Sequence, residues 1–140
     1  MAKVEYTRGN WPRHRWPNFS HSEVACSHCG VAMIDPEVMD ILQAIRRDYG
    51  NPIHITSGYR CEGHPIEAAK ARPGSHWSGK AFDVAVSHGN AYAIIYLALE
   101  HGVMGIGVNQ RGETGKRFVH LDWATAEDGY AHMRPSVWSY

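Results

Sequence analysis

Two histidines and an aspartate have the residue types and the spacing of a metal site. Residues 80–86 alternate in polarity as a half-buried strand does, which places Asp83 between two small residues on the more polar face. His76 precedes that strand in a glycine-containing loop, and His120 alternates with apolar residues in 118–122. We therefore expect His76, Asp83 and His120 to meet on the open face of one sheet.

Two imidazoles and one carboxylate suit Zn²⁺ and leave a fourth position for water. A zinc ion there would lower the pKa of that water to about 7 and polarise a bound carbonyl group. The chain contains ten histidines, so chance proximity is the alternative explanation of the pattern. On spacing alone, both interpretations stay open.

The elements that must position these residues follow from local patterns. Asp35-Pro36 begins a predicted helix over residues 36–49, with apolar residues at helical spacing and a stop at Gly50. We expect further helices at 62–70 and 90–101, and strands at 52–56, 80–86, 105–108 and 117–123. This order predicts an α+β fold with a mostly antiparallel sheet and helices packed on one side.

Length and charge indicate one domain and exclude some partners. We expect an N-terminal arm over residues 1–17 and a domain over 18–140, whose tail, 124–140, packs back on it. The formal net charge is zero, which argues against nucleic acid as a partner. The longest apolar run, 91–99, is too short to span a bilayer, and the first ten residues lack a signal peptide's apolar segment. We therefore expect no membrane insertion.

The cysteines form a second possible metal site. Cys26 and Cys29 have C-x-x-C spacing, and Cys61 and His64 have C-x-x-H spacing. Three thiolates and an imidazole would make a closed, structural zinc site. A disulfide between Cys61 and either other cysteine, or three free thiols, are the alternatives.

The same residues resemble a known family. The sequence S-H-W-S-G-K-A-F-D over residues 75–83 is similar to the first ligand motif of the zinc D-alanyl-D-alanine carboxypeptidases. F-V-H-L-D over 118–122 resembles their third-ligand motif, and T-S-G-Y-R over 56–60 resembles an upstream segment. The resemblance covers about residues 18–123 and extends to phage endolysin peptidases. It implies the hedgehog/DD-peptidase fold.

The resemblance also implies roles for individual residues. It makes His76, Asp83 and His120 ligands of one catalytic zinc ion, and Arg60 the group that stabilises the substrate or its carboxylate. Substrate contacts are expected near the motifs, from Tyr59, Ser75 and Trp77. Several branches of the family carry an acid three residues before the last histidine, where this chain has Arg117.

A general base is therefore sought elsewhere. Asp122 shares a strand face with His120 and is the candidate, either as the base or as the group that fixes the His120 ring. The two roles stay open at this point.

The expected function is zinc-dependent hydrolysis of peptide bonds in bacterial peptidoglycan stem peptides, as a carboxypeptidase or an endopeptidase. The expected protein is a monomer, made in the cytoplasm and acting on the cell wall after release or as part of a phage particle. The alternative is a non-catalytic, zinc-stabilised domain that binds the cell wall or belongs to a virion.

Overall fold

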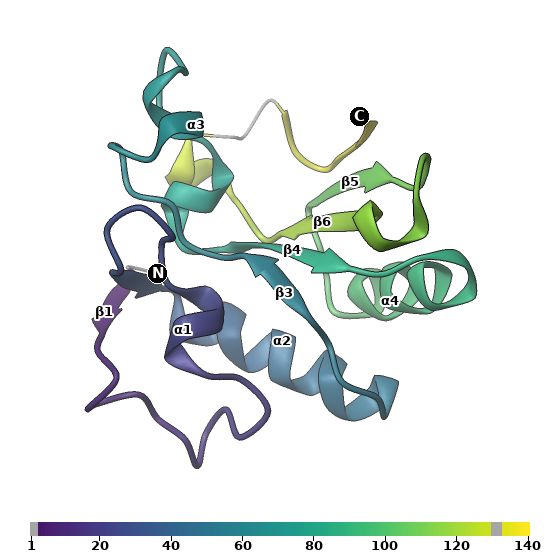
Figure 1. Ribbon diagram of the computed structural model, residues 1–140, viewed down its shortest axis with the longest axis horizontal. Coiled ribbons are helices and arrows are strands. Elements are labelled where there is room, and N and C mark those ends of the chain that lie inside the picture. The colour runs from purple at the N-terminus through teal and green to yellow at the C-terminus, as the bar shows by residue number, and fades with distance from the viewer. Residues whose placement is uncertain (1–2, 130–132) are drawn as a thin grey trace.

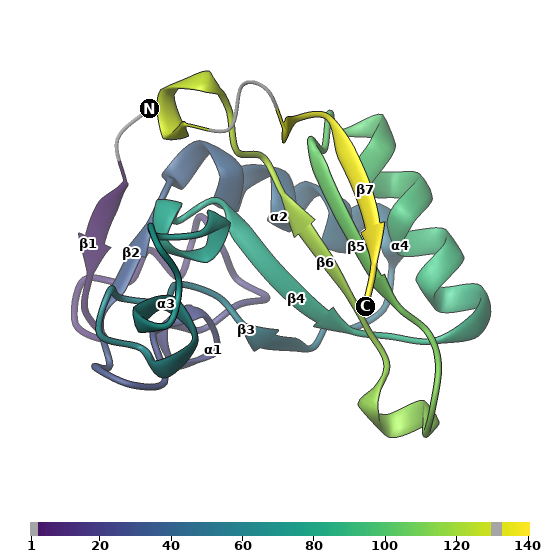
Figure 2. The same ribbon diagram turned by 90° about the horizontal axis from the view of Figure 1, so that it is seen from above.

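Five strands form the central sheet of the protein, in the order β3-β4-β6-β5-β7 (Figure 1 and Figure 2). The computed structural model describes residues 3–129 and 133–140. The strands are β1 (Val4–Tyr6), β2 (Ala32–Ile34), β3 (Ile55–Ser57), β4 (Ala81–Ala85), β5 (Gly105–Asn109), β6 (Phe118–Asp122) and β7 (Ser136–Ser139). The α-helices are α1 (His21–Val24), α2 (Pro36–Tyr49), α3 (Pro65–Ala68) and α4 (His88–Glu100), and the short 3₁₀ helices are η1 (Ser75–Ser78), η2 (Thr114–Lys116) and η3 (Ala126–Asp128).

The strand pairing is mostly antiparallel. Strands β3, β4, β6 and β5 pair antiparallel in turn, whereas β7 joins the edge of the sheet parallel to β5. Helices α2 and α4 lie together against one face of this sheet (Figure 2). The predicted α+β class with helices on one side is confirmed.

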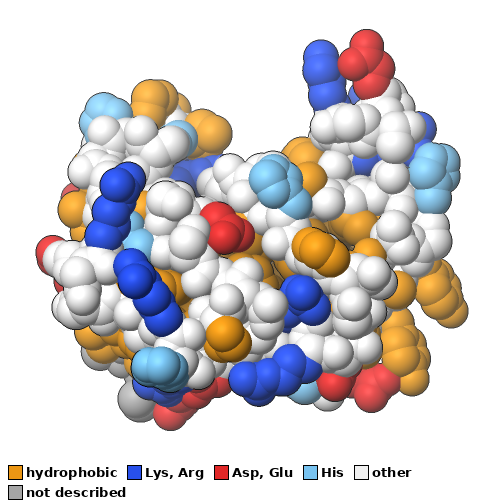
Figure 3. All heavy atoms as spheres, turned by 60° about the horizontal axis from the view of Figure 1, so that its bottom comes forward, with side chains coloured by type: hydrophobic (Ala, Val, Ile, Leu, Met, Phe, Trp, Pro, Cys, Tyr) orange, Lys and Arg blue, Asp and Glu red, His pale blue; other side chains and the backbone are white. Residues whose placement is uncertain are grey.

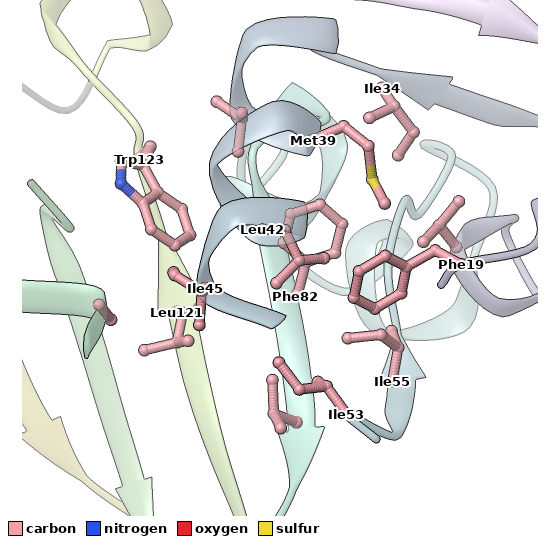
Figure 4. Close-up of a cluster of buried hydrophobic side chains, with 14 of the residues drawn as sticks. Phe19, Ile34, Met39, Leu42, Ile45, Ile53, Ile55, Phe82, Leu121 and Trp123 are labelled. Atoms are coloured by element: carbon pink, nitrogen blue, oxygen red, sulfur yellow. The ribbon is translucent and has the colours of Figure 1, made fainter. Parts of the chain in front are cut away.

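Helix α2 has the boundaries that the sequence predicts. The Asp35 carboxylate accepts hydrogen bonds from the backbone N–H groups of Glu37 and Val38, and Pro36 takes the first helical position. Gly50 ends the helix in the left-handed conformation, with φ of 75°. Met39, Leu42 and Ile45 on one face of the helix are fully buried in the core (Figure 4).

The core also fixes which way the central strands face. Phe82 and Val84 of β4, and Val119 and Leu121 of β6, are at most 1% exposed and point to the helical side. Each such apolar side chain contributes about 1.5–3 kcal/mol when buried. Because strand side chains alternate, the residues between them, Asp83 and His120, point to the opposite face.

The N-terminal arm is built into this domain. Strand β1 pairs antiparallel with β2, with Val4 opposite Ile34. Trp16 is fully buried and Trp11 nearly so, and their rings lie 5.0 Å apart at the edge of the core. The β1–β2 pair was not among the predicted elements, because its two short strands lie far apart in the sequence with α1 between them.

Other boundaries differ from the prediction. The strand expected at 52–56 forms later, as β3, and the helix expected at 62–70 is the single turn α3. The C-terminal tail contributes β7 and η3, which were not predicted, while its residues 130–132 lie outside the described part of the chain.

The surface carries charges of both signs. Lys and Arg side chains are scattered among uncharged ones on one face, with acidic and histidine side chains at several places (Figure 3). Within residues 3–129 and 133–140, none of the helices combines the length and apolar character needed to cross a bilayer.

Candidate metal centre

His76 is held by a tight turn in front of the sheet. It lies in η1, which ends at Gly79 with φ of 78°. A Cβ atom at Gly79 would lie 2.5 Å from the Met33 carbonyl oxygen, so this close approach requires glycine. The His76 Nδ1–H donates to the Gly58 carbonyl oxygen over 2.7 Å, which leaves Nε2 as the atom available for a metal.

Asp83 and His120 are direct partners across the β4–β6 pair. Asp83 Oδ1 lies 3.3 Å from His76 Nε2 and 3.1 Å from His120 Nδ1. Four ligands at about 2.0–2.1 Å around a tetrahedral zinc ion lie about 3.3–3.4 Å from one another. Both distances from Asp83 Oδ1 are therefore those of a tetrahedral zinc site, and one ligand atom of each of the three residues lies within 4.8 Å of the others. Three protein donors leave the fourth ligand position to a non-protein group.

The three side chains are buried, with exposed fractions of 8% or less. Burial lowers the pKa of His76, which keeps its imidazole neutral and able to bind a metal. Burial alone would raise the pKa of Asp83, but hydrogen bonds from His120 and His76 outweigh it and lower that pKa. His76 and Asp83 are thus in the protonation states that metal binding requires.

Asp122 lies behind His120 rather than in front of it. Its Oδ2 accepts a hydrogen bond from His120 Nε2–H over 2.7 Å and one from Arg134 Nη2 over 2.8 Å. Its Oδ1 accepts from Arg134 Nε and from the Ala124 backbone N–H. The carboxylate is fully buried, and both oxygens are engaged. This geometry favours the ring-fixing role of Asp122 over that of a general base.

Glycine in β5 makes room for this arrangement. Gly105 is the β5 partner of Asp122, and a Cβ there would collide with the Asp122 carboxylate. A Cβ at Gly107 would lie 2.6 Å from Trp138 Nε1, and the Trp138 ring lies 5.1 Å from that of His120. Sequence reasoning missed Arg134 and Trp138 as neighbours of the site, because strand β7 and the segment before it reach the site only through tertiary pairing.

Arg60 lies beside the three donors. Its Nη2 is 3.3 Å from Asp83 Oδ2, its Nε donates to Ser57 Oγ, and its Nη1 lies 3.7 Å from Glu67 Oε2. The backbone N–H of Arg60 donates to the His76 carbonyl oxygen. The guanidinium group is thus held beside the donor cluster by side chains of β3, α3 and β4.

Glu67 is a buried acid that the sequence did not single out. It accepts hydrogen bonds from the Gly74 backbone N–H over 2.7 Å and from Lys70 Nζ over 2.9 Å. Burial would raise the pKa of Glu67, but these hydrogen bonds and the charges of Lys70 and Arg60 lower it. A lone glutamate in a polar loop gives no sequence signal for such a role.

The remaining predicted substrate residues differ in their surroundings. Ser75 Oγ lies 3.4 Å from His120 Nε2, next to the cluster. Tyr59 is buried in the core, 5% exposed, and the Trp77 ring has Lys3 Nζ 3.4 Å from its centre. Core packing and this cation–π contact are enough to account for Tyr59 and Trp77.

The structure brings together three of the four residues predicted to form a second metal site. The sulfur atoms of Cys26, Cys29 and Cys61 all lie within 4.8 Å of one another. His64 is outside this group, because its Nδ1 accepts the Ile66 backbone N–H and its Nε2 lies 3.2 Å from Ser27 Oγ. The structure therefore groups the three thiols without the predicted imidazole.

Comparison with known proteins agrees with this geometry. The sequence model of a family described as Peptidase M15 matches residues 17–122, a span that contains Arg60 and all three donors. A comparison with curated proteins found no match.

Proposed function

The chain belongs to the peptidase M15 family, and from that premise we propose that it is a zinc peptidase that hydrolyses bonds in peptidoglycan stem peptides. One observation carries the proposal. The facing atoms of His76, Asp83 and His120 lie within 4.8 Å of one another, with both distances from Asp83 Oδ1 at tetrahedral values, and Arg60 lies against the other oxygen of Asp83. This arrangement suits a hydrolytic zinc site better than a closed structural one.

His76 Nε2, Asp83 Oδ1 and His120 Nδ1 are the proposed ligand atoms. When bound, zinc supplies a water molecule with a pKa near 7 and polarises the scissile carbonyl group. The chain orients the ligands for this purpose. The Gly58 carbonyl oxygen fixes the His76 ring, and the Asp122–Arg134 pair fixes the His120 ring.

Arg60 is proposed to bind the substrate. Its side chain is 13% exposed and lies against Asp83, next to the three proposed ligands. A guanidinium fork can donate two parallel hydrogen bonds to a carboxylate or to a developing oxyanion. Arg60 therefore suits a stem peptide that ends in a free carboxylate next to the bond to be cut.

The proposed substrates are D-Ala-D-Ala termini or an internal bond of the stem peptide. A neutral protein with zero formal charge would approach the anionic wall without general electrostatic attraction, so recognition would depend on local contacts. Access to the wall is proposed to follow release from the cell or delivery in a phage particle.

A second candidate function rests on Asp122. Both of its oxygens are engaged by His120, Arg134 and Ala124, which argues against its acting as a general base. A domain with zinc and Arg60 but without a base would bind cell-wall peptides and not cut them.

One experiment separates the two functions. The zinc-loaded full chain is incubated with purified peptidoglycan and, separately, with a pentapeptide that ends in D-Ala-D-Ala, with and without a chelator. Mass spectrometry of the products identifies the bond that is cut. The peptidase proposal expects chelator-sensitive release of D-alanine or of shortened stem peptides. Saturable binding of the peptide without any product would instead establish the binding domain.

A further inference from the structure

The three cysteines of the chain converge from two distant segments. Cys26 and Cys29 lie in the loop between α1 and β2, and Cys61 directly follows Arg60. Cys26 Sγ and Cys61 Sγ are 3.6 Å apart, and the Cys29 sulfur lies within 4.8 Å of both. These sulfurs lie in the region of α1 and α3, on a different part of the chain from the cluster formed by β4, β6 and η1.

We propose that these thiols bind a second zinc ion, which ties the loop before β2 to the segment that carries Arg60. In a tetrahedral zinc site with Zn–S bonds of about 2.3 Å, neighbouring sulfurs lie about 3.8 Å apart. The Cys26–Cys61 distance is close to that value and far longer than the ~2.05 Å of a disulfide bond. A disulfide would also leave the third thiol unexplained.

The backbone around Cys26 is arranged for a thiolate. The backbone N–H groups of His28 and Cys61 both donate to Cys26 Sγ, each over 3.4 Å. The Gly30 N–H donates to the Cys26 carbonyl oxygen over 2.8 Å, and Gly30 has φ of 76°, so the C-x-x-C loop closes tightly. Donors aimed at sulfur stabilise its negative charge, which is the form that binds zinc.

The fourth position is assigned to a water molecule or to a neighbouring imidazole. The His28 ring lies beside Cys61: its Nε2 is 3.5 Å, and the Cys61 sulfur 4.0 Å, from the place of a Cβ on Gly63. Within the described part of the chain, no hydrogen bond to a ring nitrogen of His28 is found, whereas both ring nitrogens of His64 have partners. Neither His28 nor His64 has a ring nitrogen in the group of mutually close ligand atoms, so the three thiols are the protein ligands that the structure brings together.

The site would act on Arg60 through the chain that connects them. Gly58 packs against Val24 so closely that a Cβ would lie 2.6 Å from the Val24 carbonyl oxygen, and the Tyr59 N–H donates to that same oxygen. Residues 58–61 are therefore docked on residues 24–26 by backbone contacts, and a zinc ion on Cys26 and Cys61 would lock that docking. Arg60 lies between Tyr59, whose backbone is hydrogen-bonded to Val24, and Cys61, which would bind the zinc ion.

Cobalt substitution tests the proposal in the full chain. The protein is purified under reducing conditions, stripped of metal and titrated with Co²⁺, which gives intense sulfur-to-cobalt charge-transfer absorption only where thiolates bind it. Bound zinc is counted in parallel by elemental analysis. Wild type should hold two metal ions per chain and show the charge-transfer band. His76→Ala should lose one ion and keep the band.

The cysteine variants and their control complete the test. Cys61→Ser and the more exposed Cys29→Ser should each lose the band and one of the two ions, while Ser27→Ala, in the same loop, should keep both. If a variant does not fold, the presence or absence of the charge-transfer band in wild type still decides whether thiolates bind the metal. A wild type that binds cobalt without the band, or that carries a disulfide after purification without reductant and binds a single ion, would overturn the proposal. If the protein is not a peptidase, the wild type should still show the charge-transfer band, so the two proposals fail separately.

Discussion

Carboxylates contact both ring nitrogens of His120. Asp83 lies 3.1 Å from its Nδ1, and Asp122 accepts its Nε2–H over 2.7 Å. Burial would lower the pKa of His120, but the hydrogen bonds with Asp122 and Asp83 outweigh it and raise that pKa. The raised pKa favours the doubly protonated ring. In the neutral ring, the hydrogen bond to Asp122 keeps the proton on Nε2 and leaves Nδ1 free for a metal ion.

Replacing Asp122 tests this positioning role. Asp122→Asn should lower zinc affinity by about 10–100-fold, because an amide holds the His120 tautomer less firmly than a carboxylate does. Competition with a fluorescent zinc chelator measures the affinity. Asp40→Asn, which removes a half-exposed acid paired with Arg15, is the control and should leave it unchanged. Unchanged zinc affinity together with lost turnover would point to the general-base role instead.

The cluster of His76, Asp83 and His120, and Asp122 beside His120, could be predicted from the sequence, whereas other neighbours of the cluster could not. The alternation in 80–86 and 118–122 placed Asp83 and His120 on one face, because strand period is a local property. Arg134, Glu67 and Trp138 gave no such signal, since their contacts depend on how a loop and a terminal strand pack.

At the scale of elements, the loop around α3 depends on one buried carboxylate. Glu67 joins the helix turn to Gly74, two residues before His76, and also contacts Lys70 and Arg60. A glutamine cannot accept the same set of charged hydrogen bonds. The loop that precedes His76 should therefore be less stable when Glu67 loses its charge.

Glu67→Gln should lower the free energy of unfolding at pH 7 by about 1–3 kcal/mol. The pKa of Glu67 in the folded protein lies below its ordinary value of 4.5. The charged carboxylate therefore stabilises wild type fully above pH 4.5, and this stabilisation is lost as the pH falls through the lowered pKa. Urea denaturation of both proteins at pH 7 and in acid measures the difference, with Glu62→Gln as the exposed control. A difference that persists or grows in acid would contradict the assignment.

The packing of strand β7 requires a glycine at position 107 of β5. A Cβ at Gly107 would meet the Trp138 indole at 2.6 Å, so Gly107→Ala should displace Trp138 and destabilise the fold by about 1–3 kcal/mol. Thermal unfolding measures the loss. Gly115→Ala is the matched control, because no heavy atom beyond its chain neighbours lies within 4 Å of the added carbon, and its change should stay within about 0.5 kcal/mol. Equal effects of the two substitutions would refute the Trp138 contact.

Elements with a strong local pattern were predicted, and those formed by distant pairing were not. Helix α2 carries its own cap, apolar face and stop, so its observed bounds equal the predicted ones. Strands β1 and β7 are short and partly exposed, and what makes them strands is a partner far away in sequence. The parallel β5–β7 pair is the part of the sheet least accessible to sequence reasoning.

At the scale of the whole molecule, bound zinc should stabilise the fold. The three donors come from η1, β4 and β6, so an ion that binds them links segments that separate on unfolding. An ion present at 1,000 times its dissociation constant contributes about 4 kcal/mol, or about 10 °C in Tm for a domain of this size. Calorimetry with and without chelator measures the shift, and an identical Tm would contradict the account.

The most direct test of the central claim is an anomalous diffraction map, recorded at the zinc edge from crystals of the zinc-loaded full chain. The account predicts a peak about 2.0–2.2 Å from His76 Nε2, from a carboxylate oxygen of Asp83 and from His120 Nδ1, with a non-protein atom in the fourth position. A map without a peak among these three side chains, or with a fourth protein ligand closing the site, would contradict it.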